Sequence, residues 1–398
     1  MYSILFVCDF TSVHSRNIVN SIRRNKEFRV SVLSTFAAPE MENVNLVSLT
    51  MGKIGDKKKL QSIADFILKL SPSLYKKIVA YMMVRKTKKL LTLIGTISLF
   101  ENPDIIHSLR TQPEGILAER LSLKYKNAKF CLTTWGQDFI LWAETNSWLN
   151  IKSKDVLKKT DYIFPDNYRD DDIIKKKYGL KNKKTLVVPA TGGIDIDFMD
   201  KLKIPKVFPL KGKINFLSTR GYDNTYVKLT ELLLVYKRIV KDYPDTHFYI
   251  DLHKNIQLNK DIKIQSWIDE NKLTNKITLL HLTREEMFTY MSKCRFHVSA
   301  TLSDGMPLSL LESLYFGQTP IVFNHASTEI LETQFSNYFS FSSYKISEIE
   351  NCWRNALEAG SQKQEIIKLK NLEIIMKYYK RRSNIEKIVN IYQELIHQ

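Results

Sequence analysis

The chain lacks any apolar run long enough to cross a membrane, although 44% of its 398 residues are hydrophobic. Its first ten residues, MYSILFVCDF, also lack the basic segment with which a secretory signal peptide begins. A continuous apolar run of this length is typical of a strand that is buried on both faces of a parallel sheet. We therefore expect a cytoplasmic protein with a first strand at its N-terminus.

Cysteine is scarce, and the four residues are scattered without any CxxC pair: Cys8, Cys131, Cys294 and Cys352. This spacing excludes the usual zinc sites and favours reduced thiols, as in a cytoplasmic protein. The chain also lacks a GxGxxG sequence, so it has no dinucleotide-binding fingerprint. The run of aspartates at 170–172 begins a charged helix, where carboxylates cap the backbone, and we do not expect it to bind a metal.

Acidic residues are few in relation to basic ones, 42 against 60, which gives a net charge of +18. Half of this excess lies in Lys53–Lys89, where eleven basic residues accompany two acidic ones. Apolar residues recur there at helical spacing, and Pro72 separates two helices. Basic amphipathic helices favour an anionic membrane surface. Two alternatives stay open: a helix that packs on the core with a solvated lysine face, and nucleic acid binding.

The stretch Ser299–Leu314, SATLSDGMPLSLLESL, joins a short apolar strand to a helix. The chain turns at Gly305, and we expect the helix to begin at Pro307 and to end before Gly317. Proline suits the first helical position, and glycine suits the residue just past a helix end. The free N–H groups at a helix start, together with the positive end of the dipole, make a seat for phosphate.

Two carboxylates, Asp304 and Glu312, flank this phosphate seat. A carboxylate near phosphate is repulsive unless it accepts hydroxyl donors, which sugars and riboses supply, so the pattern predicts a nucleotide-sugar ligand. The sequence from Asp304 to Glu312 resembles the E-x7-E signature of retaining glycosyltransferases of family 4, with aspartate as the first acid. The resemblance implies that Asp304 contacts hydroxyls of the donor sugar and that Glu312 contacts the ribose.

The same resemblance implies further donor contacts. Arg220 follows a strand where relatives carry a diphosphate-binding arginine, and a guanidinium matches phosphate oxygens. Relatives carry a lysine slightly later; here the nearest is Lys228, which could equally be an exposed helix lysine. His281 lies in the loop that runs along the nucleotide base in the family, or is a plain loop histidine. The implied donor-binding residues are Arg220, Lys228, His281, Asp304, Gly305, Met306, Pro307, Leu308 and Glu312.

Two loops of the first half are similar to acceptor loops of the family. The loop at 10–15 resembles the first-strand loop of some bacterial members and leads into a helix, so His14 is either an acceptor ligand or a helix-start residue. Trp135 begins a turn similar to their W-G-S-D sequence; it cannot transfer protons and is expected to pack or to stack on a sugar. Asp138 is a base or orienter for the acceptor hydroxyl, or a helix N-cap. The implied acceptor-binding residues are Thr11, Ser12, His14, Trp135, Gly136 and Asp138.

The architecture of the family is GT-B, an α/β fold of two Rossmann-like domains with doubly wound parallel sheets and a cleft between the domains. Strands that alternate with helices in both halves fit this expectation. The predicted domains are an acceptor-binding domain at 1–203 with basic helices at 53–89, a linker at 204–212, a nucleotide-sugar-binding domain at 213–380, and a terminal helix at 381–398 that crosses back to the first domain.

The resemblance implies transfer of a sugar, with retention, from a nucleotide-sugar to a hydroxyl of a saccharide, and we expect no metal to be needed. The leaving diphosphate would help to deprotonate the incoming hydroxyl. UDP-sugar is favoured over GDP-sugar, and no other cofactor is expected. The basic helices favour a lipid-linked acceptor in bacterial surface polysaccharide assembly, with the protein on the inner face of the plasma membrane. The implied catalytic residues are Asp304, Glu312, Arg220 and Asp138.

Two other functions are compatible with the sequence. A basic GT-B protein could bind or modify nucleic acid. A non-catalytic subunit could bind a nucleotide-sugar, because Asp304 and Trp135 stand where the family usually has glutamate and histidine.

Overall fold

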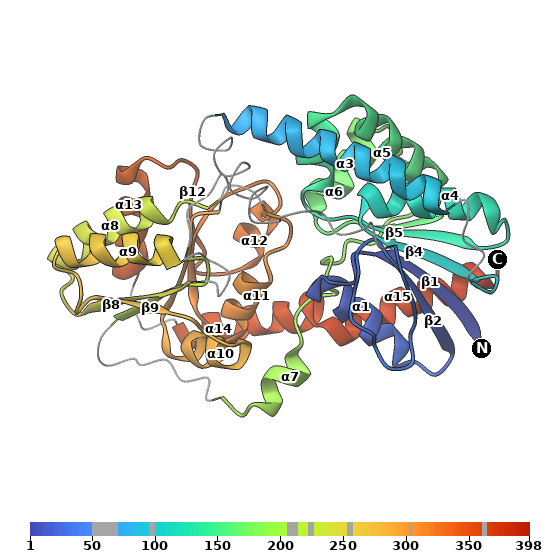
Figure 1. The fold of residues 1–398 in the computed structure, drawn as a ribbon. Helices are drawn as coiled ribbons and strands as arrows, with labels where there is room; N and C mark the ends of the chain where they lie inside the picture. Colours follow the sequence, from blue (N-terminus) through green and yellow to red (C-terminus); the bar gives the residue numbers. More distant parts are fainter. Residues whose placement is uncertain are drawn as a thin grey trace. The chain divides into compact units, whose positions relative to one another are not determined.

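The computed structural model describes residues 1–49, 71–94, 100–204, 214–221, 227–252, 258–301, 304–359 and 364–398. These residues form two compact units. Unit 1 is Met1–Gly193 with Arg381–Gln398, and unit 2 is Ile194–Lys380 (Figure 1). The first domain was predicted to end at 203, but helix α7 (Ile196–Lys201) packs Ile196 and Met199 into the core of unit 2. The predicted linker lies outside the described residues from 205 onward.

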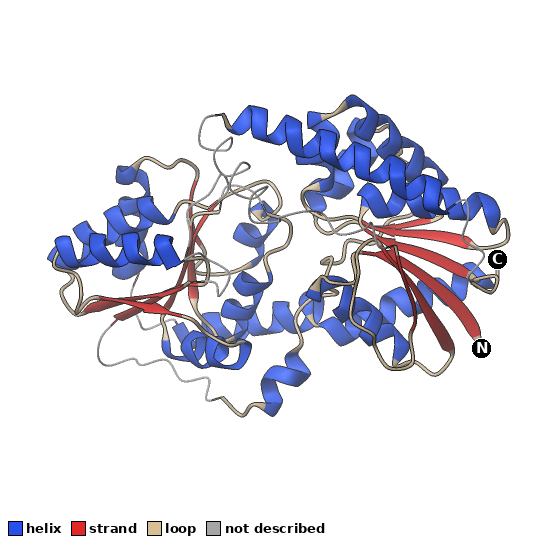
Figure 2. Ribbon diagram, in the orientation of Figure 1, coloured by secondary structure: helices blue, strands red, loops and turns tan. Residues whose placement is uncertain are grey.

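Unit 1 contains one parallel sheet of six strands in the order β3-β2-β1-β4-β5-β6 (Figure 2). The first strand lies in the middle of this sheet, which explains why its residues are almost continuously apolar. The strands are β1 (Tyr2–Cys8), β2 (Phe28–Ser34), β3 (Asn45–Ser48), β4 (Ile105–Leu109), β5 (Lys129–Thr133) and β6 (Tyr162–Phe164).

Helices cover both faces of this sheet. In Figure 1, α3, α4 and α5 lie over one face, and α1 and α15 lie over the other. The helical elements are α1 (Val13–Arg23), α3 (Pro72–Ile94), η1 (Thr111–Gly115), α4 (Ile116–Lys124), η2 (Asp138–Ala143), α5 (Ser147–Lys159), α6 (Tyr168–Asp172), η3 (Ile173–Lys177) and α15 (Arg381–Ile396). Of the basic helices predicted at 53–89, the part from Pro72 belongs to α3, and residues 53–70 lie outside the described residues.

Helix α15 is attached to the sheet of unit 1 through a buried histidine. His107 of β4 is fully buried; its Nδ1 contacts the hydroxyl of Tyr392, and its Nε2 lies 2.9 Å from Oγ1 of Thr133. Burial lowers the pKa of His107 to about 3. The predicted terminal segment 381–398 thus lies in unit 1 and completes its core with Ile388 and Tyr392.

This histidine makes the stability of unit 1 dependent on acid pH. In the unfolded chain His107 becomes protonated below pH 6.5, whereas in the folded protein it becomes protonated only near pH 3. Between these two pH values, lowering the pH therefore reduces the free energy of unfolding by up to about 1.4 kcal/mol per pH unit. Urea denaturation of His107→Gln should give a lower free energy of unfolding at pH 7 and a weaker dependence on pH. The exposed His397→Gln serves as the control, and equal slopes for both variants would contradict the prediction.

Unit 2 contains a second parallel sheet of six strands, in the order β12-β11-β10-β7-β8-β9. Neighbouring residues of its strands point to opposite faces: Phe216 of β7 belongs to a core with Trp353, and Leu217 belongs to the core below α11. The strands are β7 (Ile214–Ser218), β8 (Thr246–Asp251), β9 (Ile277–Leu280), β10 (Phe296–Ser299), β11 (Thr319–Phe323) and β12 (Phe339–Phe341).

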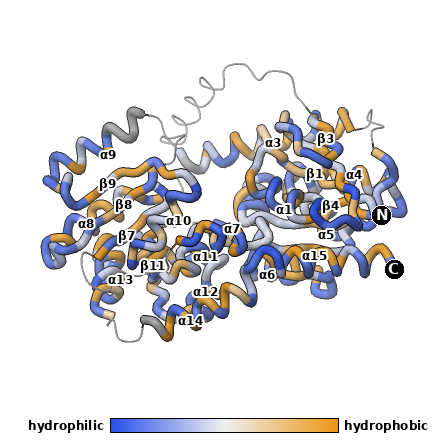
Figure 3. Tube along the Cα trace, turned by 90° about the horizontal axis from the view of Figure 1, so that it is seen from below, coloured by the Kyte–Doolittle hydropathy of each residue, from blue (hydrophilic) through white to orange (hydrophobic). Residues whose placement is uncertain are grey.

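The helices of unit 2 divide between these two cores. Helices α8, α9 and α13 contribute to the core that contains Trp353. The other helices of unit 2 contribute to the core that contains Leu217, or flank it. Along the tube of Figure 3, hydrophilic and hydrophobic residues alternate in the helices, as amphipathic helices on a sheet require. Besides α7, the helical elements are α8 (Leu229–Asp242), α9 (Leu258–Glu270), α10 (Arg284–Lys293), α11 (Leu308–Tyr315), α12 (Glu329–Gln334), α13 (Ile346–Glu358), α14 (Gln364–Ile374) and η5 (Ile375–Tyr379).

The predicted fold class of two doubly wound parallel sheets is therefore confirmed. Within the described part of the chain, every helix is too short or too polar to span a bilayer.

Candidate functional site

The predicted phosphate-binding site lies at the start of α11, and this helix begins one residue later than expected. Pro307 is the N-cap residue, with φ −75° and ψ 113°, and the helix begins at Leu308. The prediction that Pro307 is the first helical residue is therefore wrong, because its ψ is extended; its carbonyl still accepts the N–H of Leu311, at 3.2 Å. The helix ends at Tyr315, and Gly317 follows with φ +79°, which favours glycine.

Two of the predicted donor-binding side chains form an ion pair beside this helix start. Arg220, which follows β7, contacts the carboxylate of Asp304, and each side chain is 27% exposed. The other Asp304 oxygen accepts the N–H of Gly305 at 2.9 Å, and the guanidinium of Arg220 lies 3.4 Å from Oγ1 of Thr301. A cation and a carboxylate are thus held together at the carboxyl end of the sheet, where ligands bind in doubly wound folds.

The second acid of the motif pairs with an arginine that the sequence did not reveal. Glu312 is 1% exposed and its Oε1 contacts Arg284, the first residue of α10. The guanidinium of Arg284 also lies 4.9 Å from the centre of the Phe288 ring. Arg284 precedes Glu312 by 28 residues, so only the tertiary structure brings the two side chains together.

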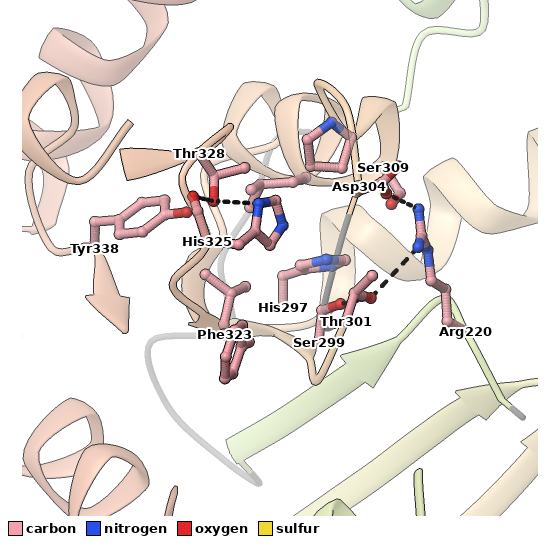
Figure 4. A pocket seen from close by; sticks show the side chains of 13 residues that line it. Arg220, His297, Ser299, Thr301, Asp304, Ser309, Phe323, His325, Thr328 and Tyr338 are labelled. Atoms are coloured by element: carbon pink, nitrogen blue, oxygen red, sulfur yellow. Dashed lines mark hydrogen bonds and ion pairs between the residues drawn. The ribbon is translucent and has the colours of Figure 1, made fainter. Parts of the chain in front are cut away.

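A small, partly open pocket lies between Asp304 and the ends of β10 and β11 (Figure 4). Arg220 and Asp304 of its polar lining were predicted from the sequence, whereas the histidine, hydroxyl and tyrosine side chains were not. His297 is 1% exposed, and burial together with the nearby Arg220 lowers its pKa to about 3, so it is neutral. The pocket residues labelled in Figure 4 are Arg220, His297, Ser299, Thr301, Asp304, Ser309, Phe323, His325, Thr328 and Tyr338.

The remaining predicted donor-binding residues lie at the same edge of unit 2 or in its core. The N–H of Lys228 donates to the carbonyl of Ala300 at 3.0 Å, which fixes the start of α8 beside the end of β10. His281 follows β9, and its Nδ1 lies 2.8 Å from the carbonyl oxygen of Leu252. Met306 is buried in the core below α11, so it anchors the loop through its side chain.

Gly221 sets the position of Arg220. A Cβ at residue 221 would lie 2.5 Å from the carbonyl oxygen of Asp251, and the backbone would have to move. We expect Gly221→Ala to destabilise unit 2 by about 1–3 kcal/mol and to weaken nucleotide binding at least tenfold. Gly179→Ala is the control: φ +72° strains this variant, but it lies in unit 1. Thermal melts and nucleotide titrations of both variants test the prediction, which fails if they bind nucleotide equally well.

In unit 1, the structure brings together two residues of the predicted acceptor loops. The rings of His14 and Trp135 pack edge to face with centroids 5.6 Å apart. His14 lies in the first turn of α1, and its N–H donates to the Ser12 hydroxyl at 3.3 Å, so it is also a helix-start residue. Thr11 donates its hydroxyl hydrogen to the carboxylate of Asp9 at 2.6 Å.

Asp138 is fully buried and joins two loops. Its Oδ2 accepts the N–H groups of Thr111 at 2.7 Å and Trp135 at 3.0 Å, and its Oδ1 lies 3.5 Å from Nε of Arg110. Burial raises the pKa of Asp138. The alternative of a helix N-cap is wrong, because Asp138 is the first residue of η2 and Gln137 holds the cap position. The carboxylate orients the Trp135 turn; Gly136 within it accepts a hydrogen bond from Arg169 at 2.6 Å.

Three charged residues of unit 1 were not predicted to belong to a site, although Lys86 lies in the predicted basic helices. Glu114 is 1% exposed, its Oε1 accepts the hydroxyl of Thr35 at 2.7 Å, and burial raises its pKa. Lys86 of α3 lies with its Nζ 3.1 Å from the centre of the Phe36 ring. Burial lowers its pKa to about 8. Arg110 follows β4. Arg110 and Glu114 lie close together after β4, but Lys86 comes from α3, so no local pattern marks the three as a set.

The comparisons with known proteins concern a sequence family and solved structures. A family model described as "Glycosyl transferase 4-like" matches residues 3–167, less than half of the chain. No curated protein matches the chain by sequence.

Solved structures match the chain over almost its entire length. Sucrose-phosphate synthase from Thermosynechococcus elongatus has a TM-score of 0.69 at 10% identity and covers 100% of both chains. HepE from Anabaena, in complex with UDP and glucose, has a TM-score of 0.67 at 11% identity, with 99% of both chains covered. The chain has the GT-B fold. A further GT-B neighbour is a glycosyltransferase from Rickettsia africae, with a TM-score of 0.66 at 16% identity and 99% and 98% of the two chains covered.

Proposed function

We propose that the protein is a glycosyltransferase that moves a sugar, with retention, from a nucleotide-sugar to a hydroxyl of a saccharide. The observation that carries this proposal is the position of Arg220 and Asp304 beside the start of α11, at the carboxyl end of the unit 2 sheet. A GT-B neighbour that binds UDP and glucose supports this assignment. We infer that UDP-sugars are the preferred donors.

The charges at this edge match the chemistry of a departing diphosphate. The bond between the sugar C1 and the diphosphate oxygen breaks, and a bond from C1 to the acceptor oxygen forms on the same face, while the diphosphate takes the hydroxyl proton. Arg220 and the free N–H groups at the start of α11 would stabilise the negative charge that develops on the leaving group. We infer that this positive charge makes a divalent metal unnecessary. Asp304 would bind sugar hydroxyls, and Glu312 would bind the ribose.

The experiment that tests this function combines binding with product analysis. A thermal-shift screen should include UDP-, GDP-, ADP- and dTDP-sugars, because a ligand at about 100 times its Kd adds roughly 2.7 kcal/mol of stability. NMR analysis of the anomer released or transferred from the best donor should show the configuration of the donor. Release of the opposite anomer would refute retention, and the absence of any nucleotide-sugar binding would refute the function.

The exposed surface of α3 supports an acceptor at an anionic membrane. Leu74, Tyr81 and Met82 are 50%, 64% and 54% exposed, an unusual exposure for large apolar side chains. Exposed basic residues accompany them along the same helix, namely Lys77, Arg85, Lys88 and Lys89. Apolar and basic side chains together would bind the headgroup region of anionic lipid. A lipid-linked saccharide of bacterial surface polysaccharide assembly, at the inner face of the plasma membrane, is the proposed setting.

Flotation with lipid vesicles tests this part of the proposal. The protein should float with vesicles rich in phosphatidylglycerol and should remain behind with phosphatidylcholine alone. Each basic residue near such a surface contributes about 1 kcal/mol, so Lys88→Gln with Lys89→Gln should reduce binding at least tenfold. The double substitution Lys175→Gln with Lys176→Gln, outside α3, is the control. DNA binding with a steep dependence on salt, without flotation, would favour the nucleic acid alternative.

A further inference from the structure

Two pairs of a cation and an aromatic ring occur in unit 1, Lys86 with Phe36 and Arg110 with Trp135, and Arg110 is near enough to act electrostatically on Lys86. We call these four residues the Lys86–Trp135 patch. The ammonium of Lys86 lies on the Phe36 ring, with Nζ 3.1 Å from its centre. The guanidinium carbon of Arg110 lies 5.2 Å from the centre of the Trp135 ring. Both aromatic residues are partly exposed, and the rings of Trp135 and His14 pack edge to face. The patch therefore adjoins the predicted acceptor loops.

Lys86 differs from the other described lysines of α3 that face solvent. Its side chain is half-buried, and the groups that act on it electrostatically are Glu114 of η1, Asp9 after β1 and Arg110 after β4. Among the described residues, no carboxylate lies within 4.0 Å of its ammonium, and it donates no hydrogen bond. Glu114 is already held by Thr35 through one carboxylate oxygen. A partly desolvated ammonium in this state favours an anion that approaches from outside.

Arg110 is in a similar state. Its nearest carboxylate is Asp138, at 3.5 Å, which already accepts two backbone N–H groups. The side chain is 18% exposed, and its Nε has no hydrogen-bond partner among the described residues. A guanidinium held in place by an aromatic ring and a distant carboxylate retains the donors that bind phosphate oxygens in pairs.

We propose that Lys86 and Arg110 form an anion subsite in the acceptor site of unit 1, which binds a phosphate ester attached to the acceptor saccharide, with the sugar ring against Trp135. This inference rests on the proposed function, because it names the chemical class of the acceptor. A phosphorylated sugar and a saccharide on a lipid diphosphate share this chemistry. An uncharged sugar has no phosphate, so it would leave Lys86 without an anionic partner and Arg110 with Asp138 alone.

Binding of simple phosphate probes tests the subsite. The whole chain with Arg220→Gln is used throughout, so that phosphate bound in unit 2 does not contribute. Calorimetric titration should detect glucose 6-phosphate binding and little binding of glucose. Lys86→Gln and Arg110→Gln should each weaken the binding of glucose 6-phosphate about 10- to 100-fold, the range for a lost hydrogen bond to a charged group.

Two further variants separate charge recognition from folding. Lys86→Arg keeps the positive charge and should retain most of the affinity. Lys154→Gln, which changes an exposed lysine of α5, should bind like the parent. A farnesyl diphosphate-linked sugar that binds far more tightly than glucose 6-phosphate would assign the anion to a lipid-linked acceptor. The reverse order would assign it to a free sugar phosphate.

The inference is overturned if glucose binds as tightly as its phosphate, if neither phosphate probe binds, or if Lys86→Gln and Lys154→Gln behave alike. Failure of the proposed function would appear differently, as the absence of nucleotide-sugar binding to the unmodified chain. The two failures are therefore distinguishable.

Discussion

Arg220→Gln is expected to reduce sugar transfer by about 10²- to 10³-fold, the usual effect of removing one group that stabilises charge in a transition state. Arg220 is the cation beside the start of α11, and its guanidinium already contacts a carboxylate there. A diphosphate would take the place of that carboxylate as the partner of the arginine. Measurement of kcat and kcat/KM with the donor identified by screening tests this expectation.

Two variants serve as controls for this result. Arg220→Lys retains a point charge but loses the paired donors of the guanidinium, and it should have an intermediate rate. Arg238→Gln removes an arginine of α8 that is 55% exposed and pairs with Glu350, so it should leave the rate unchanged. An Arg220→Gln enzyme with the rate of the unmodified protein would contradict the proposed role of this residue, provided that its thermal melt shows a folded protein.

Glu312→Gln is expected to weaken nucleotide binding by about 10- to 100-fold. Its carboxylate is buried and aligned by Arg284, so the amide fills the same volume but loses the charge. A hydrogen bond from a ribose hydroxyl to a carboxylate contributes about 1.5–3 kcal/mol, which sets this range. Calorimetric titration with UDP measures the effect.

The control for this variant is Glu329→Gln, which changes an exposed glutamate at the start of α12. It should bind UDP as the unmodified chain does. A 2′-deoxyribose nucleotide should bind the unmodified protein and Glu312→Gln with more similar affinities. It lacks the 2′-hydroxyl, one of the two ribose hydroxyls that could donate a hydrogen bond to the carboxylate. Equal affinity of Glu312→Gln and the parent for UDP would show that Glu312 does not contact the ribose.

The parts of the site that lie in one short segment could be predicted from the sequence. The strand, turn and helix around Asp304 and Glu312 are local, since the spacing of the two acids and the positions of Gly305 and Gly317 define them within a few residues. The start of the helix was misplaced by one residue at Pro307, because proline tolerates both the cap and the first turn, and only its ψ decides between them.

Contacts between distant segments could not be predicted in this way. The partner of Glu312 is Arg284, and the Lys86–Trp135 patch joins α3, the ends of β2 and β4, and the turn after β5. The boundary between the units was also missed, because α7 has only six residues and its apolar side chains do not reveal which sheet they cover. The alternation of strands and helices, by contrast, determined the fold class correctly, since buried parallel strands are marked by continuous apolar runs.

The most direct test of the central claim is a crystal structure of the protein with UDP bound. We expect diphosphate oxygens within hydrogen-bond distance of Arg220 and of the amides at the start of α11, and a ribose hydroxyl that donates a hydrogen bond to Glu312. A nucleotide bound elsewhere, with the contact between Arg220 and Asp304 intact and Glu312 still paired only with protein, would contradict it.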